Sequence, residues 1–194
     1  MQNSRARALV SIGASAVLAA AAVAATTAPS QAAGKGKGGK TVAVATWAPA
    51  DQAEIHPGTQ MYTDGAQCTG NFVFTDGAAN VYVGYAAHCA GTGGATETNG
   101  CDSGSLPLGT KVDFVEGGSL VTSGEKVGTG TLVYSSWLAM QQAGTTDTNA
   151  CDYNDFALVK VDAEYVDDVN PSIPFWGGPV GINTDGTAAG ETVY

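Results

Sequence analysis

Glycine is the residue type that most restricts how this chain can fold. It makes up 27 of the 194 residues, about 14%, which is roughly twice the usual share of ~7%. The glycines are scattered rather than periodic, so they exclude a collagen-like repeat and disfavour long helices. Scattered glycine suits short strands joined by turns, and the length allows one domain or slightly more.

Short apolar and β-branched runs, each bounded by Gly, Asp or Asn, predict the strands of this domain. Only the segment Ser135–Ala143 offers a plausible helical turn or two. The expected strands are Cys68–Phe74, Val81–Tyr85, Lys111–Glu116, Lys126–Tyr134 and Phe156–Val161. This pattern indicates an all-β domain, either a barrel or a sandwich.

The chain carries a strong excess of negative charge. From Thr41 onward three lysines (Lys111, Lys126 and Lys160) face all 18 acidic residues. Such a surface repels phosphate groups, so we expect no binding to nucleic acid or to an anionic membrane. The acids Asp162, Glu164, Asp167 and Asp168 are expected to form a solvated face.

Residues 1–33 have the pattern of a secretory signal peptide. Arg5 and Arg7 precede an uncharged, mostly apolar run from Ala8 to Ala25, and small residues follow around Ser30-Gln31-Ala32. The alternative is a membrane anchor, since ~18 apolar residues could just span a bilayer. No positive stop-transfer cluster follows directly, which favours cleavage and a secreted, extracellular protein.

Residues 34–54 are predicted to be a flexible linker or a short propeptide. The stretch from Gly34 to Lys40 contains only Gly and Lys and has too few apolar side chains to pack. Residues 41–54 could equally be a propeptide or an N-terminal arm, and the sequence does not decide between them.

Four cysteines lie in the exported part, at Cys68, Cys89, Cys101 and Cys151. In an oxidising compartment two disulfides are the default, with three possible connectivities. A metal site is the alternative, but zinc ligands usually come in close pairs, whereas these cysteines are 21, 12 and 50 residues apart. We therefore expect no metal and no cofactor.

Two short motifs carry the chemistry. The strand Val81–Tyr85 runs into Ala86-Ala87-His88-Cys89, which places a histidine beside a cysteine and among small residues. Further on, Asn154-Asp155 opens the apolar run Phe156–Val161. Together, and in this order, the motifs resemble those of the trypsin-like (chymotrypsin-fold) serine endopeptidases, in particular secreted bacterial members. Taken alone, His88 would be a structural histidine and Asp155 a strand-capping aspartate.

The resemblance implies a role for each matched residue. His88 would be the general base that takes the proton of the nucleophile and returns it to the leaving amine. Asp155 would hold the imidazole in the correct tautomer and stabilise the imidazolium. The resemblance also implies a Cys68–Cys89 disulfide beside the histidine, with Cys101–Cys151 as the second pair.

The resemblance implies a domain organisation as well. Residues 55–175 would form the first antiparallel β-barrel, and residues 176–194 would form the crossing segment and the first strand of a second barrel. The family's G-D-S-G nucleophile motif is absent between Asp155 and Tyr194, where the sole serine is Ser172. We therefore expect an incomplete protease, which is inactive as written.

Other candidates carry less weight. Ser103 lies in Asp102-Ser103-Gly104-Ser105, but this position would give the chain order His, Ser, Asp, and the composition is that of an ordinary turn. His56 lies in a Pro-Gly turn and is expected to be exposed. The acids Asp147, Asp152 and Asp155 lack the spacing of an EF-hand calcium loop.

The sequence supports one leading function and two alternatives. The leading function is a secreted serine endopeptidase that acts as a monomer on protein or peptide substrates, without nucleic acid or, after signal cleavage, membrane. One alternative is a non-catalytic trypsin-like domain that binds a partner. The other is a secreted β-sandwich binding module, in which His88 and Asp155 would be unrelated residues.

Overall fold

The computed structural model describes residues 45–94, 98–119, 121–178 and 184–192. The chain divides into two compact units, Met1–Gly38 and Gly39–Tyr194, and every described residue belongs to the second unit. The expected signal peptide, 1–33, lies outside the described residues. Within the described ranges, no helix has the length and apolar character needed to cross a membrane.

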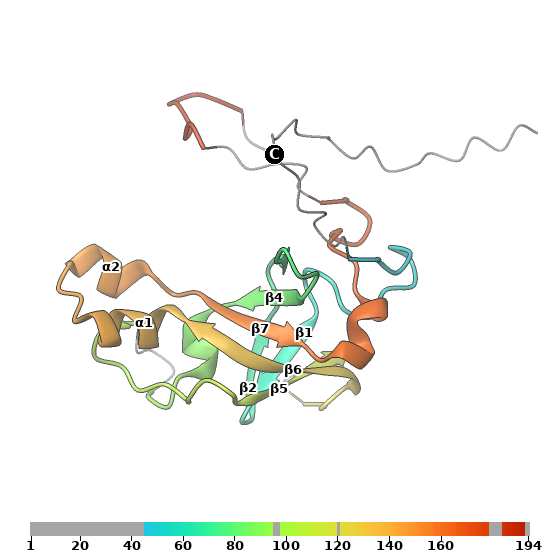
Figure 1. Ribbon diagram of the computed structural model, residues 1–194, viewed down its shortest axis with the longest axis horizontal. Coiled ribbons are helices and arrows are strands. Elements are labelled where there is room, and N and C mark those ends of the chain that lie inside the picture. Colours follow the sequence, from blue (N-terminus) through green and yellow to red (C-terminus); the bar gives the residue numbers. More distant parts are fainter. Residues whose placement is uncertain (1–44, 95–97, 120, 179–183, 193–194) are drawn as a thin grey trace, which may run out of the picture. The chain divides into compact units, whose positions relative to one another are not determined.

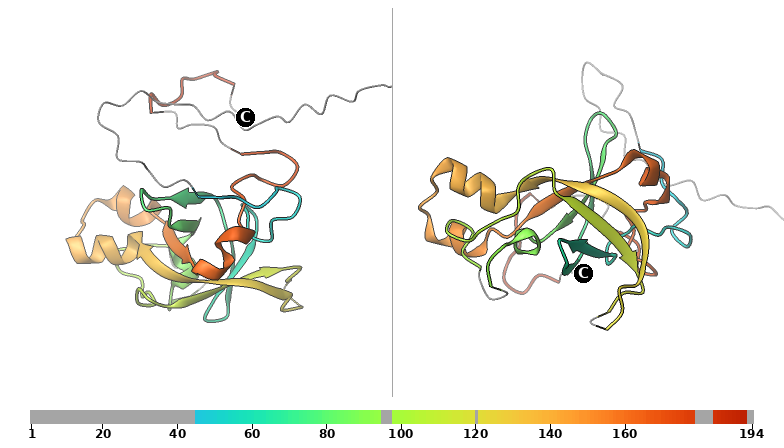
Figure 2. Two further views of the ribbon diagram at one scale, coloured as in Figure 1. Left: turned by 45° about the vertical axis from the view of Figure 1, so that its right-hand side comes forward. Right: turned by 90° about the horizontal axis from the view of Figure 1, so that it is seen from below.

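The second unit is built on one antiparallel sheet of seven strands, which confirms the all-β prediction (Figure 1). The order across the sheet is β2-β1-β5-β6-β7-β4-β3, and Figure 2 shows that its long strands are strongly curved. The strands are β1 (Gln60–Thr63), β2 (Ala66–Thr69), β3 (Val73–Thr75), β4 (Val81–Tyr85), β5 (Lys111–Glu116), β6 (Glu125–Ser135) and β7 (Ala157–Val161). Because β2 and β3 are the two edges, the sheet is not closed.

Helices are few and short, and two of them lie directly before β7 in the chain. Helix α1 (Ser136–Ala143) continues from β6, and α2 (Thr148–Tyr153) ends shortly before β7 begins. Two 3₁₀ helices, η1 (Ala87–Ala90) and η2 (Ala163–Asp168), follow β4 and β7. The sequence predicted α1, whereas β1, η1, α2 and η2 were missed.

The core fills one side of the sheet through the alternation of side chains along each strand. In β7, Ala157, Val159 and Val161 are buried while Lys160 is exposed. The largest fully buried side chains around them include Tyr85, Phe114 and Leu132. At Gly130 a Cβ would lie 2.6 Å from Val159 Cγ1, so only glycine permits this close approach of β6 to β7.

The predicted strand Cys68–Phe74 is in fact two strands. Gly70 donates its N–H to Thr59 O (2.8 Å), whereas Asn71 donates to Gly84 O (2.8 Å). The chain therefore leaves β1 at this point and joins β4. A Cβ on Gly70 would approach Val83 Cγ1 to 2.9 Å, which explains why a glycine stands at the crossing.

Both ends of the described chain lie outside the sheet. Ala48 donates its N–H to Val169 O (3.0 Å), and Asn170 Nδ2 donates to Ala48 O (2.6 Å). The described part of segment 34–54 is thus hydrogen-bonded to the segment after η2. At the other end, the described residues 184–192 contain no strand or helix, and Glu191–Tyr194 is described only through Thr192.

Candidate active site

His88 stands on η1, the single-turn helix that follows β4. Its neighbours Ala87, Cys89 and Ala90 are buried, so they anchor the turn in the core while the imidazole points outward. The His88 side chain is 48% exposed. Behind the turn, Gly91 donates its N–H to His88 O (2.8 Å), where a Cβ would have no room. The small residues of the motif therefore fix the histidine backbone and leave its ring accessible.

Asp155 lies between α2 and β7, and it binds His88 with both carboxylate oxygens. Oδ2 lies 2.6 Å from the imidazole Nδ1, and Oδ1 accepts the backbone N–H of His88 at 2.8 Å. The two residues are 67 positions apart in the sequence. This double contact fixes both the position of the histidine and the orientation of its ring, and it favours the tautomer with the proton on Nδ1.

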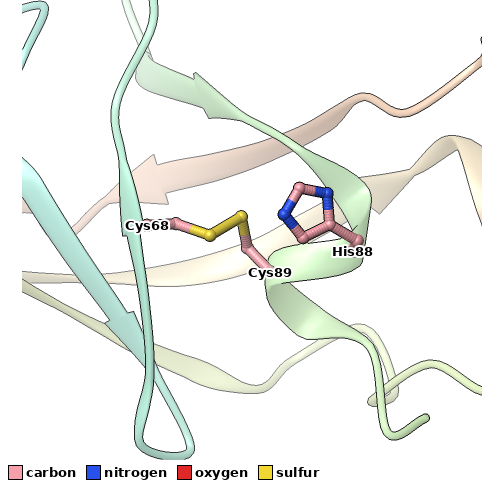
Figure 3. Close-up of side chains that lie close together, drawn as sticks. All are labelled: Cys68, His88 and Cys89. Atoms are coloured by element: carbon pink, nitrogen blue, oxygen red, sulfur yellow. A yellow bond between two sulfur atoms is a disulfide. The ribbon is translucent and has the colours of Figure 1, made fainter. Parts of the chain in front are cut away.

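The second ring nitrogen, Nε2, has no hydrogen-bond partner among the described residues. Figure 3 shows that Nε2, the ring nitrogen remote from Cβ, is directed toward the disulfide side of the ring. With a proton on Nδ1, Nε2 carries the free lone pair. A base is thus held with its accepting atom open to an incoming group.

A buried serine that the sequence analysis missed holds the backbone on both sides of Asp155. Ser136, at the start of α1, donates its hydroxyl to Asn154 O (2.7 Å) and accepts the N–H of Phe156 (3.0 Å). Its own N–H donates to Phe156 O (2.8 Å). Ser136 has no exposed surface. Nothing in the pattern Ser135-Ser136 distinguishes such a residue from an ordinary helix start.

The structure contains two disulfides, Cys68–Cys89 and Cys101–Cys151, which are the pairs that the resemblance implies. The first ties the histidine turn η1 to β2. The second ties the loop after η1 to α2, four residues before Asp155. Each disulfide therefore braces one member of the His88–Asp155 pair. Two disulfides are compatible with an extracellular protein.

A pocket of about 370 Å³ lies beside His88. Its lining comes from β2, from η1, from the loop after η1 and from α1. The lining residues are Ala66, Gln67, Cys68, His88, Cys89, Gly91, Gly93, Gly94 and Trp137. Trp137 is 2% exposed, and a Cβ on Gly91 would lie 3.3 Å from its ring. The wall of the pocket is therefore mostly backbone, disulfide and indole.

Cys68, His88 and Cys89 also have the ligand types of a metal site. Their sulfur and nitrogen atoms lie within 4.8 Å of one another. The two sulfurs, however, are bonded to each other (Figure 3), and a disulfide offers no thiolate to a metal ion. In this oxidised form the cluster is a brace for the histidine turn.

The remaining candidates have structural roles. Ser103 is 2% exposed and donates its hydroxyl to Asn99 O (2.6 Å), which is not the environment of a nucleophile. His56 is half-buried rather than exposed, with Nδ1 2.9 Å from Pro57 O. Asp147 caps α2 by accepting from Ala150 N (2.8 Å), and Asp152 accepts from Asn99 Nδ2 (3.1 Å). These acids therefore act separately from Asp155.

The prediction of a solvated face is wrong for Asp162 and Asp168, which are both half-buried, whereas Glu164 and Asp167 are exposed. The partners of Asp162 explain its place. Asp162 binds Lys111 Nζ (2.9 Å) and the Thr129 hydroxyl (2.6 Å). The hydrogen bond from Thr129, followed by Lys111, lowers the pKa of Asp162 below its ordinary value. A strand-end aspartate can thus be structural, so residue type alone does not identify the functional one.

Comparison of the chain with protein-family models, with curated proteins and with solved structures finds no match. The chemical interpretation therefore rests on the site itself. A carboxylate that orients an imidazole, with the second ring nitrogen open, is an arrangement for general acid–base catalysis.

Proposed function

We propose that this protein is a secreted serine endopeptidase of the trypsin-like type, in which His88 is the general base and Asp155 orients it. In the proposed reaction a serine hydroxyl attacks the substrate carbonyl and gives its proton to His88 Nε2. His88 then passes this proton to the leaving nitrogen as the C–N bond breaks. Water repeats the sequence on the acyl-enzyme and regenerates the serine.

One observation carries the proposal. His88 and Asp155, which two separate motifs single out, are joined by a contact of 2.6 Å between Nδ1 and Oδ2. Asp155 binds the His88 ring at Nδ1, and Nε2 is open among the described residues, so the imidazole keeps one atom for a reacting group. The antiparallel sheet and the disulfide next to His88 support a trypsin-like fold, which we include in the proposal; the described strands form an open sheet, so closure into a barrel is part of the proposal.

A second candidate is a non-catalytic trypsin-like domain that binds a partner. It is favoured by the fact that no serine hydroxyl of the described residues bonds to His88 Nε2. The endopeptidase proposal therefore requires a nucleophile outside the described residues, whereas the binding domain requires none. This requirement separates the two candidates.

The test is to label the protein, purified from culture medium of cells that carry the complete gene, with a fluorophosphonate. We expect covalent labelling of one serine outside the described residues, together with hydrolysis of an unfolded protein substrate. The His88→Ala variant should abolish both, because the serine then lacks its base. A secreted protein with both disulfides formed but neither labelling nor hydrolysis would support the binding domain instead.

A further inference from the structure

We propose that Cys68, His88 and Cys89 form a zinc site in the reduced protein, and that the Cys68–Cys89 disulfide keeps this site from forming in the oxidised protein. The two thiolates and His88 Nε2 bind the ion, and water takes the fourth position. This inference goes beyond the proposed function, because it needs no nucleophile. It also adds a condition to that function, since zinc on Nε2 occupies the lone pair that the base uses.

The three residues have the donor set of a zinc site. Their ligand atoms lie within 4.8 Å of one another, and among the residues that the structure describes no other group of three histidine, cysteine or acidic side chains meets this limit. Figure 3 shows His88 Nε2 directed toward the two sulfurs. Thiolate and imidazole both suit zinc, and three protein ligands with one open position are a common zinc arrangement.

The contact between His88 and Asp155 fits a metal ligand as well as a base. An imidazole that binds a metal usually donates its other N–H to a carboxylate or carbonyl, which fixes the tautomer and the orientation of the ring. Here Asp155 Oδ2 lies 2.6 Å from Nδ1, and Oδ1 accepts the backbone N–H of His88. The ring is therefore oriented before the ion binds.

The backbone holds the two cysteines at a distance that suits a shared ion. Two sulfurs on one tetrahedral zinc ion are about 3.8 Å apart, because each Zn–S bond is about 2.3 Å long. The Cα atoms of Cys68 and Cys89 are 6.0 Å apart, so rotation of the two side chains separates the sulfurs while β2 and η1 stay in place. The pocket beside His88 gives an ion access, since all three ligand residues line it.

Reduction requires a reagent, and a dithiol supplies the electrons. One thiolate of the dithiol attacks Cys68 Sγ, the S–S bond breaks, and its electron pair leaves on Cys89 Sγ. Cys68 is the more accessible of the two, because it is half-buried and Cys89 is 2% exposed. The second thiol of the reagent then displaces Cys68. The protein gains two electrons and two protons, and the dithiol becomes a cyclic disulfide. Zinc binding releases the two thiol protons.

The experiment measures Co²⁺ binding, because this ion binds the same ligands as zinc and its absorption spectrum reports thiolate ligands. The full protein, purified from culture medium, is reduced with dithiothreitol, freed of the reagent under nitrogen and titrated with Co²⁺. We expect one ion per chain, a thiolate-to-cobalt charge-transfer band, and displacement of Co²⁺ by Zn²⁺. The oxidised protein should not show this band.

A matched pair of cysteine variants locates the site. Cys68→Ser removes one ligand and should abolish tight binding of Co²⁺, whereas Cys101→Ser removes a cysteine of the other disulfide and should leave it unchanged. Asp155→Asn should weaken binding by about 10–100-fold, because the ring loses its orienting partner. His88→Ala should weaken binding further. Equal losses in Cys68→Ser and Cys101→Ser, or full binding in His88→Ala, would overturn the inference.

The fold of the reduced protein is measured by near-ultraviolet circular dichroism, because reduction removes stabilising bridges. If the reduced chain loses this signal, Zn²⁺ should restore it, since metal binding to a folded site contributes to the free energy of folding. A reduced chain that zinc neither binds nor refolds would overturn the inference.

Failure of this inference is distinguishable from failure of the proposed function. Fluorophosphonate labelling of the oxidised protein, without Co²⁺ binding to the reduced protein, would leave an endopeptidase that has no zinc site and would overturn the inference. Co²⁺ binding that depends on Cys68 and His88, without labelling, would support the zinc site in a protein that does not hydrolyse peptides.

Discussion

Two aspartates bracket β7, and they differ in what they bind rather than in how they are placed. Asp155 precedes the strand and Asp162 follows it, and their side chains are 27% and 28% exposed. Asp155 binds the His88 imidazole and backbone N–H, whereas Asp162 binds the Lys111 ammonium and the Thr129 hydroxyl. The two aspartates have the same residue type, flank the same strand and are equally exposed, so the two ends of β7 differ in the partner of the aspartate.

The difference in partner decides what each end can do. An ammonium group offers donors and no acceptor, so the Lys111–Asp162 pair holds β5 to the end of β7 and leaves no atom to accept a proton. The imidazole of His88 has a second ring nitrogen that can accept or donate a proton, so the His88–Asp155 pair has an atom left for an incoming group. Of the two carboxylates, only Asp155 therefore has a partner that fits the role we propose for this site.

Replacing each aspartate by asparagine should show the largest difference in activity between the two ends of β7. Asp155→Asn keeps the shape but favours the wrong imidazole tautomer, so the peptidase activity that we propose should fall by about 10⁴-fold. Asp162→Asn should leave the activity unchanged, because Asp162 binds no group of the site. The measurement is kcat/KM on a peptide substrate at pH 8.

A control checks that Asp155 acts through His88. In the double variant with His88→Ala, the loss should be little greater than in His88→Ala alone, because members of one catalytic unit are not additive. Additive losses, or equal losses in Asp155→Asn and Asp162→Asn, would contradict a special role for the Asp155 end of β7.

The two disulfides should differ in their contribution to stability. Cys101–Cys151 closes a separation of 50 residues and Cys68–Cys89 one of 21. By the chain-entropy estimate, replacing each pair by alanine should lower the free energy of unfolding by about 4 and about 3 kcal/mol, respectively. Urea denaturation of the two double variants measures the order. A greater loss for Cys68–Cys89 would show that the short bridge at His88 contributes more than its loop length.

Ser136 and Thr129 provide a matched pair of hydroxyls for the two ends of β7. Ser136→Ala leaves Asn154 O and Phe156 N without their partner, which should lower the free energy of unfolding by about 1–3 kcal/mol. Thr129→Val removes one bond to Asp162, whose side chain is 28% exposed, so water can replace the hydroxyl and the cost should be less than about 1 kcal/mol. Equal costs in urea denaturation would contradict the stronger restraint at the Asp155 end.

Much of the sheet could be predicted from the sequence, because its central strands are apolar runs with clear breakers. β4 and β5 have the predicted bounds, and β7 begins one residue later than predicted. The split between β2 and β3 could not be predicted, since it depends on the change of hydrogen-bond partner from Thr59 at Gly70 to Gly84 at Asn71. β1 is only four residues long and has no strong apolar pattern.

The candidate site was predictable to a different degree. His88 and Asp155 stand in short local motifs, so the sequence singles them out, and the fold brings them into contact. The two hydrogen bonds of the Ser136 hydroxyl and the wall of the pocket depend on tertiary packing. Nothing in the local sequence distinguishes this serine or the lining glycines from others. Asp162 was predicted to be solvated because it begins an acidic run, and the sequence did not indicate its partners Lys111 in β5 and Thr129 in β6.

The smallest expected effect is the pH dependence of the Asp162 end. The pKa of Asp162 is lowered in the folded protein, chiefly by the Thr129 hydroxyl and then by Lys111. Because the folded-state pKa lies below the unfolded value near 4, this stabilisation is fully present above the unfolded pKa and is lost as the pH falls through the folded pKa. Asp162 is partly exposed, so the contribution should be below about 1 kcal/mol.

Urea denaturation of the unaltered protein and of Asp162→Asn between pH 7 and pH 2.5 measures this contribution. The stability difference should shrink once the pH falls below about 4, and a difference that stays constant would contradict this account.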